Sequence, residues 1–382
     1  MFKNQCKAIT SIIVNLVNGI RLIINAQSAI LDVFKRIIFG GFAMSEKLST
    51  RDKILELLEA NEGVYLSGEE IAARVGISRT AVWKAVKKLQ ENGYTINAVT
   101  KRGYCLVGKS DVLSEKKIRS YMHPEAPGII MDVFGTVDST NTVCLKRISG
   151  EEHTLDRRQV YAAIAGAQTQ GRGRRGRSFF SPDGTGLYMS ILLRPAAMTS
   201  DQAMRFTTIA AVAAAEAIEA VSARAASIKW VNDIYVGGRK VCGILTEASF
   251  NPEDGTLDYA VVGIGINVYE PVGGFPDDIS DRAGSVTKSN CEEVVIENGG
   301  RNRLAAEILS RFFSYLADFS EKYVEEYKRR CFVTGMDVDV VKAGAEPVSA
   351  RVLGVDDECH LMVRYEDGTT ETLSSGEISI RL

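Results

Sequence analysis

The chain has 382 residues, of which 45% are hydrophobic and 25% are charged, a balance typical of a globular protein with two or three domains. Its formal net charge of −2 excludes a general attraction to nucleic acid, so any DNA binding must depend on a local cationic patch. The seven cysteines include no Cys-x-x-Cys pair, which argues against a disulfide framework and a zinc site and favours reduced thiols in the cytoplasm. The three scattered histidines argue against a histidine-based triad.

Residues 1–43 are apolar and weakly basic, but charged residues such as Arg21, Asp32 and Lys35 interrupt them. They therefore lack the uncharged span of about 18 residues that a transmembrane helix needs. An amphipathic membrane anchor is an open alternative without strong support in the sequence. We interpret the segment as an upstream extension of the reading frame, with Met44 as the working start and no membrane partner. An intact mass of native protein that begins at Met1 would refute this interpretation.

Residues 48–109 have the pattern of a winged helix-turn-helix domain. Ser67 and Glu70 form a capping box for a second helix, Gly76 makes the turn, and Ser78 caps a third helix. Two short strands are predicted at 93–96 and 103–106, and the cationic loop between them would be the wing.

The alternative for this domain is a small helical docking module whose lysines form a solvated face. Cations cluster on the third helix and the wing, whereas the first two helices are acidic, and this asymmetry favours DNA. A monomer would bind weakly, so we expect a dimer on two half-sites. The predicted DNA-binding residues are Ser78, Arg79, Thr80, Lys84, Lys87, Lys101 and Arg102.

A second domain is predicted at 112–332, after a linker at 108–111. Its first strand is expected at 129–133, and a polar run at 138–141 precedes a helix. Taken alone, that run is a simple N-cap; beside a ligand-binding loop its side chains become candidate donors. An alanine-rich helix is expected at 201–220.

The segment from Gln168 to Ser190 has the densest alternation of glycine and arginine in the chain. Glycine amides can close around an anion, and arginine adds a planar fork of donors that matches carboxylate or phosphate oxygens. The alternative is a disordered RGG-like tail that binds nucleic acid. The run occurs once and lies between apolar segments at 160–165 and 187–193, which favours a folded loop that binds a small anion. It contains no Walker A sequence.

Residues 228–236 are predicted as an apolar strand that Asn232 and Asp233 interrupt, and a polar pair there costs stability unless it serves a site. Lys240 follows a Gly-Gly turn; it either neutralises a carboxylate or phosphate or is an ordinary solvent-facing hairpin lysine. A further strand is expected at 257–268, with glycines that permit close backbone approach.

The C-terminal part has helical periodicity at 304–327 and then five short alternating segments from residue 337 onward. Their regular spacing predicts a small β-barrel of about 50 residues.

Three blocks of sequence together carry a resemblance to a known family: Gly171 to Pro182, Lys229 to Tyr235, and Lys240 to Leu245. With the winged helix in front, the chain resembles the bifunctional biotin protein ligases that also repress biotin-synthesis operons. The resemblance covers about residues 48–382. Its arginine-glycine loop is specific to the family, whereas the Lys-Trp-x-Asn-Asp block is shared with lipoyl-transfer relatives. Two departures, Val231 for a usual proline and Phe179 for a usual tryptophan, both keep apolar bulk.

The resemblance implies an α+β multidomain fold. After the extension at 1–43, a winged helix-turn-helix (48–109) would precede a class II synthetase-like catalytic domain with a mixed or antiparallel sheet (112–332) and a small SH3-like β-barrel (335–382).

It also implies a two-step reaction. The carboxylate of biotin attacks the α-phosphate of ATP, giving biotinyl-5′-adenylate and pyrophosphate, and the lysine amine of a biotin carboxyl carrier protein of acetyl-CoA carboxylase then attacks the anhydride. Preorganised cations and Mg²⁺ would stabilise the charge that grows on the phosphoryl oxygens. The implied partners are this carrier protein, operator DNA, and a second copy of the chain in a dimer formed when biotinyl-adenylate is bound.

Roles for individual residues follow from the matching positions. The implied catalytic residues are Lys240, Arg174 and Arg172. The implied biotin-binding residues are Ser139, Thr140, Asn141, Gln168, Arg172, Gly173, Arg174, Arg175, Gly176, Lys240 and Gly243. The implied adenylate-binding residues are Arg175, Arg177, Trp230, Asn232 and Asn267, with Mg²⁺ at Asp233.

Two alternatives differ in chemistry. A biotin-sensing transcription factor without catalysis would bind biotin but form no adenylate, and the presence of Arg174 and Lys240 argues against it. A lipoate protein ligase would share the fold and the reaction, and the arginine-glycine loop favours biotin.

Overall fold

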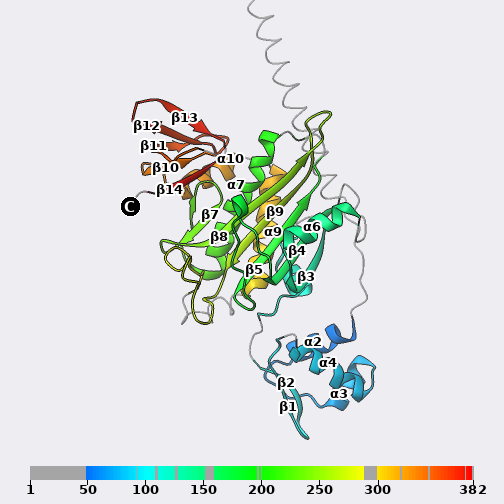
Figure 1. Ribbon diagram of the computed structural model, residues 1–382. Helices are drawn as coiled ribbons and strands as arrows, with labels where there is room; N and C mark the ends of the chain where they lie inside the picture. The colour runs from blue at the N-terminus through cyan, green and yellow to red at the C-terminus, as the bar shows by residue number, and fades with distance from the viewer. Residues whose placement is uncertain are drawn as a thin grey trace, which may run out of the picture.

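A computed structural model of the protein describes residues 49–380 except 92, 108–110, 125–127, 151–158, 196, 197, 199, 288–298, 319, 320, 343, 344 and 375. The predicted extension at 1–43 lies outside the described residues. The described chain forms three parts in sequence order: a small helical part with a hairpin, a central sheet with helices, and a C-terminal antiparallel sheet (Figure 1).

The first part has the arrangement that the sequence predicts, three helices followed by a two-stranded hairpin (lower part of Figure 1). The elements are α2 (Thr50–Glu59), α3 (Gly68–Val75), α4 (Arg79–Glu91), β1 (Ile96–Val99) and β2 (Gly103–Leu106).

Both predicted helix caps in this part are confirmed. The hydroxyl of Ser67 accepts a hydrogen bond from the backbone N–H of Glu70 at 3.1 Å, and Ser78 accepts one from Ala81 at 3.2 Å. Gly76 ends α3 with a φ of +76°, a conformation that favours glycine. The first wing strand begins at Ile96 rather than at residue 93, because the preceding residues close α4.

The central part is built on a sheet that has seven strands within the described residues, in the order β3-β4-β5-β9-β8-β7-β6. β3 and β4 run parallel and the remaining neighbours run antiparallel, so the sheet is mixed. The strands are β3 (Ile129–Val137), β4 (Val160–Gln168), β5 (Gly186–Leu193), β6 (Ser227–Lys229), β7 (Asp233–Val236), β8 (Arg239–Phe250) and β9 (Leu257–Asn267).

Helices cover both faces of this sheet. Along β4 the side chains alternate, so that Ala162 and Ile164 lie in the main core whereas Tyr161 and Ala163 pack with α6 on the other face. Strands covered on both faces are almost continuously apolar, which explains the uninterrupted burial of β4 and β5. The helices are α5 (Glu115–Tyr121), α6 (Thr140–Ser149), α7 (Ser200–Ser222), α9 (Gly300–Asp318) and α10 (Glu321–Arg330).

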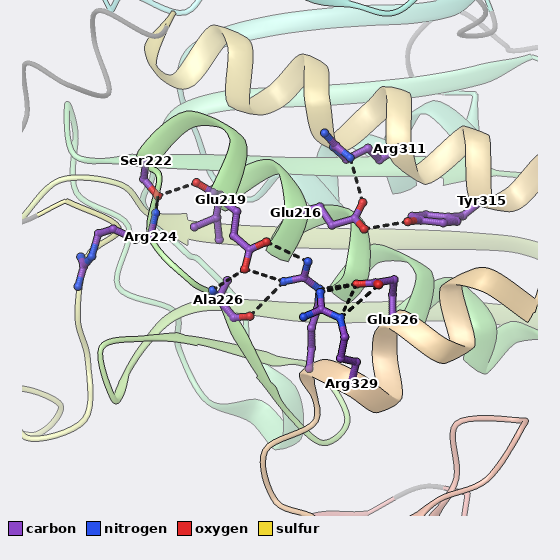
Figure 2. A network of polar contacts seen from close by, with 11 residues as sticks. Glu216, Glu219, Ser222, Arg224, Ala226, Arg311, Tyr315, Glu326 and Arg329 are labelled. Atoms are coloured by element: carbon purple, nitrogen blue, oxygen red, sulfur yellow. Dashed lines mark hydrogen bonds and ion pairs between the residues drawn. The ribbon is translucent and has the colours of Figure 1, made fainter.

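The helices α7, α9 and α10 are tied together by polar contacts at the edge of the core (Figure 2). Glu216 of α7 accepts hydrogen bonds from Arg311 and Tyr315 of α9. Glu219 of α7 accepts two from the guanidinium of Arg330, at 2.8 and 2.9 Å. Within the described residues, no helix has both the length and the apolar character needed to cross a membrane.

Two sequence predictions about this part are corrected. Residues 228–236 form two strands, β6 and β7, because Lys229 pairs with Asp233 and the chain reverses between them. The interrupting polar pair therefore lies at a hairpin turn and the start of β7. The helical periodicity at 304–327 belongs to two helices, α9 and α10.

The C-terminal part is an antiparallel sheet with the strand order β13-β12-β11-β10-β14. All five short strands predicted from the alternating sequence are present. They are β10 (Asp337–Val341), β11 (Val348–Val355), β12 (Leu361–Tyr365), β13 (Thr370–Leu373) and β14 (Glu377–Ile380).

The linker between the first two parts is held by Asp111. Its carboxylate accepts hydrogen bonds from the backbone N–H of Arg301 (2.7 Å), the Nε of Arg301 (2.8 Å) and the hydroxyl of Tyr269 (2.6 Å). The same guanidinium donates to the carbonyl of Gly186, at the start of β5, at 3.0 Å. The linker is therefore anchored to the central sheet by a buried ion pair.

Candidate active site

The arginine-glycine segment is an ordered loop that leaves the end of β4 and returns to β5. The N–H of Gly173 donates to the carbonyl of Arg177 at 2.7 Å, and the N–H of Phe179 donates to Gly171 at 2.9 Å. A side chain at Gly171 would collide with the backbone of Phe179 and lie 2.6 Å from the hydroxyl of Ser181, so only glycine fits there. These contacts support the folded-loop prediction over the disordered tail.

The polar run after β3 forms a buried network with Gln168 at the loop entrance. Gln168 Oε1 accepts hydrogen bonds from the N–H and the hydroxyl of Thr140, at 2.9 and 3.2 Å. Ser139, Thr140 and Asn141 are 3–4% exposed. Ser139 is the N-cap of α6, yet within the described part of the chain its side chain makes no capping hydrogen bond. Capping alone therefore does not account for this run.

Two members of the network, Ser190 and Glu247, are absent from the sequence prediction. The hydroxyl of Ser190 lies 2.7 Å from Thr140 Oγ1 and 2.6 Å from Asn141 Oδ1. Glu247 Oε2 accepts from Asn141 Nδ2 at 2.6 Å and from Arg172 at 3.0 Å. In the sequence, Ser190 could have been recognised as a small polar residue inside the apolar run 187–193. No sequence pattern singles out Glu247.

Arg172, Arg174 and Arg175 of the loop diverge toward different partners. Arg172 pairs with Glu247 on β8. Arg174 donates to the side-chain oxygen of Asn232 at 3.0 Å and to the carbonyl of Gly376 at 2.7 Å. Arg175, whose φ is +56°, donates to the carbonyl of Val341 at 2.8 Å. The loop thus connects the central sheet to the C-terminal sheet. The fourth arginine of the loop, Arg177, is exposed.

Lys240 and Asp233 meet across the β7–β8 hairpin. Lys240 Nζ lies 2.7 Å from Asp233 Oδ1, and the two side chains are 32% and 20% exposed. Lys240 is thus a half-buried, charge-paired residue rather than a solvent-facing hairpin lysine. Next to it, Asn232 holds the turn, because its Nδ2 donates to the carbonyl of Ile244 at 2.8 Å.

Three glycines give the site a flat apolar floor on β8 and β9. A Cβ at Gly243 would lie 3.2 Å from the ring of Phe179 and 3.4 Å from Lys240 Cε, and one at Gly265 would lie 2.8 Å from the same ring. A Cβ at Gly263 would overlap the side chain of Asn141. The floor, on which the ring of Phe179 packs, lies between the polar network and the Lys240–Asp233 pair.

The structure places the remaining predicted site residues as follows. Asn267, at the end of β9, donates to the carbonyl of Gly284 at 3.1 Å. Trp230 is 3% exposed, and its Nε1 donates to the carbonyl of Cys359 in the C-terminal sheet at 3.0 Å. The indole thus fastens the two sheets together, and its predicted contact with the adenylate stays a prediction. Gly173 and Gly176 lie within the loop turn.

The predicted DNA-binding residues lie together on α4 and the hairpin wing, and all seven are exposed. The guanidinium of Arg102 lies 4.1 Å from the ring centroid of Tyr65, which orients the wing. The hydroxyl of Ser78 serves as the cap of α4.

Comparison with known proteins agrees with this geometry. The profile of the biotin/lipoate A/B protein ligase family matches residues 133–267, that of an HTH domain matches 50–105, and that of the biotin protein ligase C-terminal domain matches 338–381. A curated relative, the bifunctional ligase/repressor BirA of Bacillus spizizenii, is 31% identical over 331 residues, which are 85% of this chain and 97% of the relative. The chain belongs to the bifunctional ligase/repressor family of biotin protein ligases.

Other members of the family give the same picture. The bifunctional ligase/repressor BirA of Escherichia coli is 30% identical over 341 residues, 86% of this chain and 96% of its own length. Among solved structures, a biotin protein ligase from Aquifex aeolicus in complex with biotin and ATP is 26% identical, with a TM-score of 0.52, and covers 66% of this chain and 98% of its own length. The central and C-terminal parts therefore have the biotin ligase fold.

Proposed function

We propose that this protein activates biotin with ATP to biotinyl-5′-adenylate, transfers biotin to a lysine of a biotin carboxyl carrier protein, and represses biotin-related genes through its helix-turn-helix. The observation that carries the ligase function is the site itself. An arginine-rich loop and a half-buried lysine flank an apolar floor, in a chain that belongs to the ligase/repressor family.

Biotin has a polar bicyclic head, an apolar chain and a terminal carboxylate, and the polar network, the apolar floor and Lys240 offer matching surroundings in that order. We assign the head to the network of Ser139, Thr140, Asn141 and Gln168. The aliphatic chain would lie along the glycine floor where the ring of Phe179 packs in this structure, so the ring would have to move away from Gly243 and Gly265. The carboxylate would then lie toward Lys240.

At the reacting centre, we assign the charge stabilisation to this chain's own cations. The carboxylate oxygen of biotin attacks the α-phosphorus of ATP, the bond to the bridging oxygen breaks, and pyrophosphate leaves with the electron pair. Lys240 would neutralise the oxygens on which charge grows, and preorganised donors of this kind typically contribute 10²–10³ in rate. Arg172, Arg174, Arg175 and Arg177 would close over biotin and the adenylate and retain the intermediate.

The nucleotide side of the site would be formed by Asn232, Asn267 and Trp230, with Mg²⁺ at Asp233. Asp233 suits the ion, since Mg²⁺ usually binds through one or two carboxylates and the substrate phosphates. In this structure the carboxylate is paired with Lys240, so the two cations would share it. When bound, Mg²⁺ supplies neutralisation of the phosphates. Calorimetry of ATP binding with Asp233→Asn tests the assignment: an unchanged dependence on Mg²⁺ would refute it.

The ligase proposal is tested by biotin-dependent ATP–pyrophosphate exchange, followed by addition of a biotin carboxyl carrier domain and streptavidin blotting. Exchange with acceptor labelling is the expected result. Biotin binding without exchange would leave a sensor that has lost its chemistry, and preferential use of lipoate in competition would indicate the lipoate ligase.

The repressor half of the proposal rests on the exposed cationic surface of α4 and the wing. Ordering of the loop around biotinyl-adenylate would complete a dimer surface, and the dimer would place two helix-turn-helix domains on one operator. A sedimentation measurement with and without biotin and ATP tests this. A dimerisation constant that does not respond to the adenylate would rule out the coupling.

Three further points of the proposal concern architecture and location. The five short antiparallel strands are consistent with a curved SH3-like barrel, and the mixed sheet with a class II synthetase-like domain. An experimental structure with a flat C-terminal sheet would refute the first assignment. We place the protein in the cytoplasm, where its acceptor would be found, and cell fractionation tests that.

A further inference from the structure

The recognition surface of α4 contains a large aromatic side chain that the fold does not use. Trp83 is 52% exposed, whereas Val82, Val86 and Leu89 on the adjacent face of the helix are 0–2% exposed and form the core of the domain. The core is complete without the indole, so its exposure calls for a different explanation.

Trp83 lies within the cationic surface, on the side nearer the buried residues of α4. With 3.6 residues per turn, Arg79 and Lys87 lie one turn away on either side of it, and Thr80 and Lys84 are adjacent on the same exposed side. The ammonium of Lys87 lies 5.5 Å from the ring centroid, which holds the indole along the helix surface. An apolar ring surrounded by cations would meet the bases while the cations meet the phosphates.

The chemistry of the major groove limits what an indole can contact there. The base edges present hydrogen-bond donors and acceptors, and the distinctive apolar group among them is the C5-methyl of thymine. Apolar wedges that unstack base pairs act mainly from the minor groove, whereas the second helix of a helix-turn-helix enters the major groove. We propose that Trp83 is a specificity-determining residue that contacts a thymine methyl in each half-site of the operator. This inference rests on the proposed DNA-binding function.

The test begins with the full-length protein, supplied with biotin and ATP, selecting its preferred sequence from a random duplex library. Each thymine of that sequence is then replaced in turn by deoxyuridine, which removes only the methyl group and keeps every hydrogen-bonding atom. Affinities are measured for the unsubstituted protein, for Trp83→Ala and for Val64→Ala. The last is a matched control, because Val64 is an apolar residue outside α4 that is 54% exposed.

We expect one thymine position per half-site where loss of the methyl weakens binding by about fourfold, as for one buried methyl group. The same replacement should change the affinity of Trp83→Ala by less than about 1.5-fold, and Val64→Ala should behave like the unsubstituted protein. Of the two tryptophans, Trp230 is buried in the catalytic domain, so indole fluorescence should respond to operator DNA in the unsubstituted protein and not in Trp83→Phe.

Several results would overturn the inference. If each uracil replacement weakens binding by the same factor in the unsubstituted protein and in Trp83→Ala, the indole contacts no thymine methyl group. Unchanged DNA affinity in Trp83→Ala would indicate that this surface binds a protein instead. Failure of the unsubstituted protein to select or bind any sequence would refute the proposed repressor function itself. A thermal unfolding curve and a far-ultraviolet circular dichroism spectrum equal to those of the unsubstituted protein show that the helix-turn-helix of Trp83→Ala is folded.

Discussion

The close approach of Gly263 to Asn141 makes a quantitative prediction about the biotin site. In Gly263→Ala the new Cβ would overlap Asn141 Oδ1 and lie 3.0 and 3.1 Å from its Cγ and Nδ2. Asn141 is 4% exposed, so its amide must rotate away from both of its partners, Ser190 and Glu247. We therefore expect the substitution to disrupt the whole polar network.

The magnitude follows from the two hydrogen bonds at 2.6 Å that the rotation breaks. A neutral hydrogen bond contributes about 0.5–1.5 kcal/mol and one to a charged group about 1.5–3 kcal/mol, so the loss is about 2–4 kcal/mol. For a domain of this size each kcal/mol lowers Tm by about 2–4 °C, which predicts a decrease of about 5–15 °C. Biotin affinity should fall as well, because Asn141 is assigned to the head group.

Calorimetric unfolding and biotin titration measure these effects. Gly135→Ala in β3 is the control, since a Cβ there would meet no described atom within 4 Å. The decisive comparison is Gly263→Ala in an Asn141→Ala background, where the crowded amide is gone and the cost should nearly vanish. If the losses of unfolding free energy in Gly263→Ala and Asn141→Ala add to the loss in the double variant within about 0.5 kcal/mol, the crowding argument is wrong.

Four further predictions concern the loop, the catalytic pair and the domain contacts. Lys240→Ala should lower biotin-dependent pyrophosphate exchange by about 100-fold or more with little change in Tm, and an exchange rate equal to that of the unsubstituted protein would refute its role. Arg174→Gly should release the adenylate and biotinylate bystander lysines; labelling that stays limited to the acceptor would count against retention. Arg330→Met should destabilise the protein by about 1.5–3 kcal/mol in urea titrations, because the carboxylate of Glu219 loses both hydrogen bonds from Arg330 and keeps the one from the backbone N–H of Ala226. Burial raises the pKa of Glu219, but the hydrogen bonds from Arg330 and the backbone N–H of Ala226, together with the charges of Arg330 and Arg329, lower the pKa below its ordinary value. The pair therefore stabilises the protein above the ordinary glutamate pKa, and this contribution disappears as pH falls through the lowered pKa. The acid limb of stability should be flatter in Arg330→Met, and an identical limb in both proteins would contradict this. Asp111→Asn should reduce the factor by which biotin and ATP raise operator affinity, with acceptor biotinylation unchanged; an unaltered factor in filter binding would exclude a coupling role.

Local patterns in the sequence predicted local structure well. The capping box at Ser67, the cap at Ser78 and the glycine turn at Gly76 each depend on residues within a few positions of one another, and all three are present. The alternation of polar and apolar residues likewise predicted the strands of the C-terminal sheet.

Such local patterns do not predict contacts between segments that are distant in the sequence. Glu247 joins the site through Asn141, 106 residues away in the chain, and Arg174 reaches Gly376, 202 residues away. The sequence pattern did not predict the turn after Lys229, because the partner of its polar groups lies in β8: the side-chain amide of Asn232 donates to the carbonyl of Ile244. An apolar run interrupted by polar residues is therefore ambiguous until the satisfying partner is known.

The position of Arg301 bears on how the two halves of the molecule communicate. Its guanidinium binds the carboxylate of Asp111, in the linker after the helix-turn-helix, and the carbonyl of Gly186, directly after the arginine-glycine loop. Both ends are buried, and a close-packed interior transmits a shift at one end to the other. Tyr269 contributes a second link, because it closely follows Asn267, which we assign to the nucleotide, and donates to the same carboxylate. A ligand that orders the loop would thus have a path of a few hydrogen bonds to Asp111, in the linker that follows the helix-turn-helix of its own chain. On this argument, dimerisation would raise operator affinity by joining two half-sites, while this linkage would set how each helix-turn-helix is held.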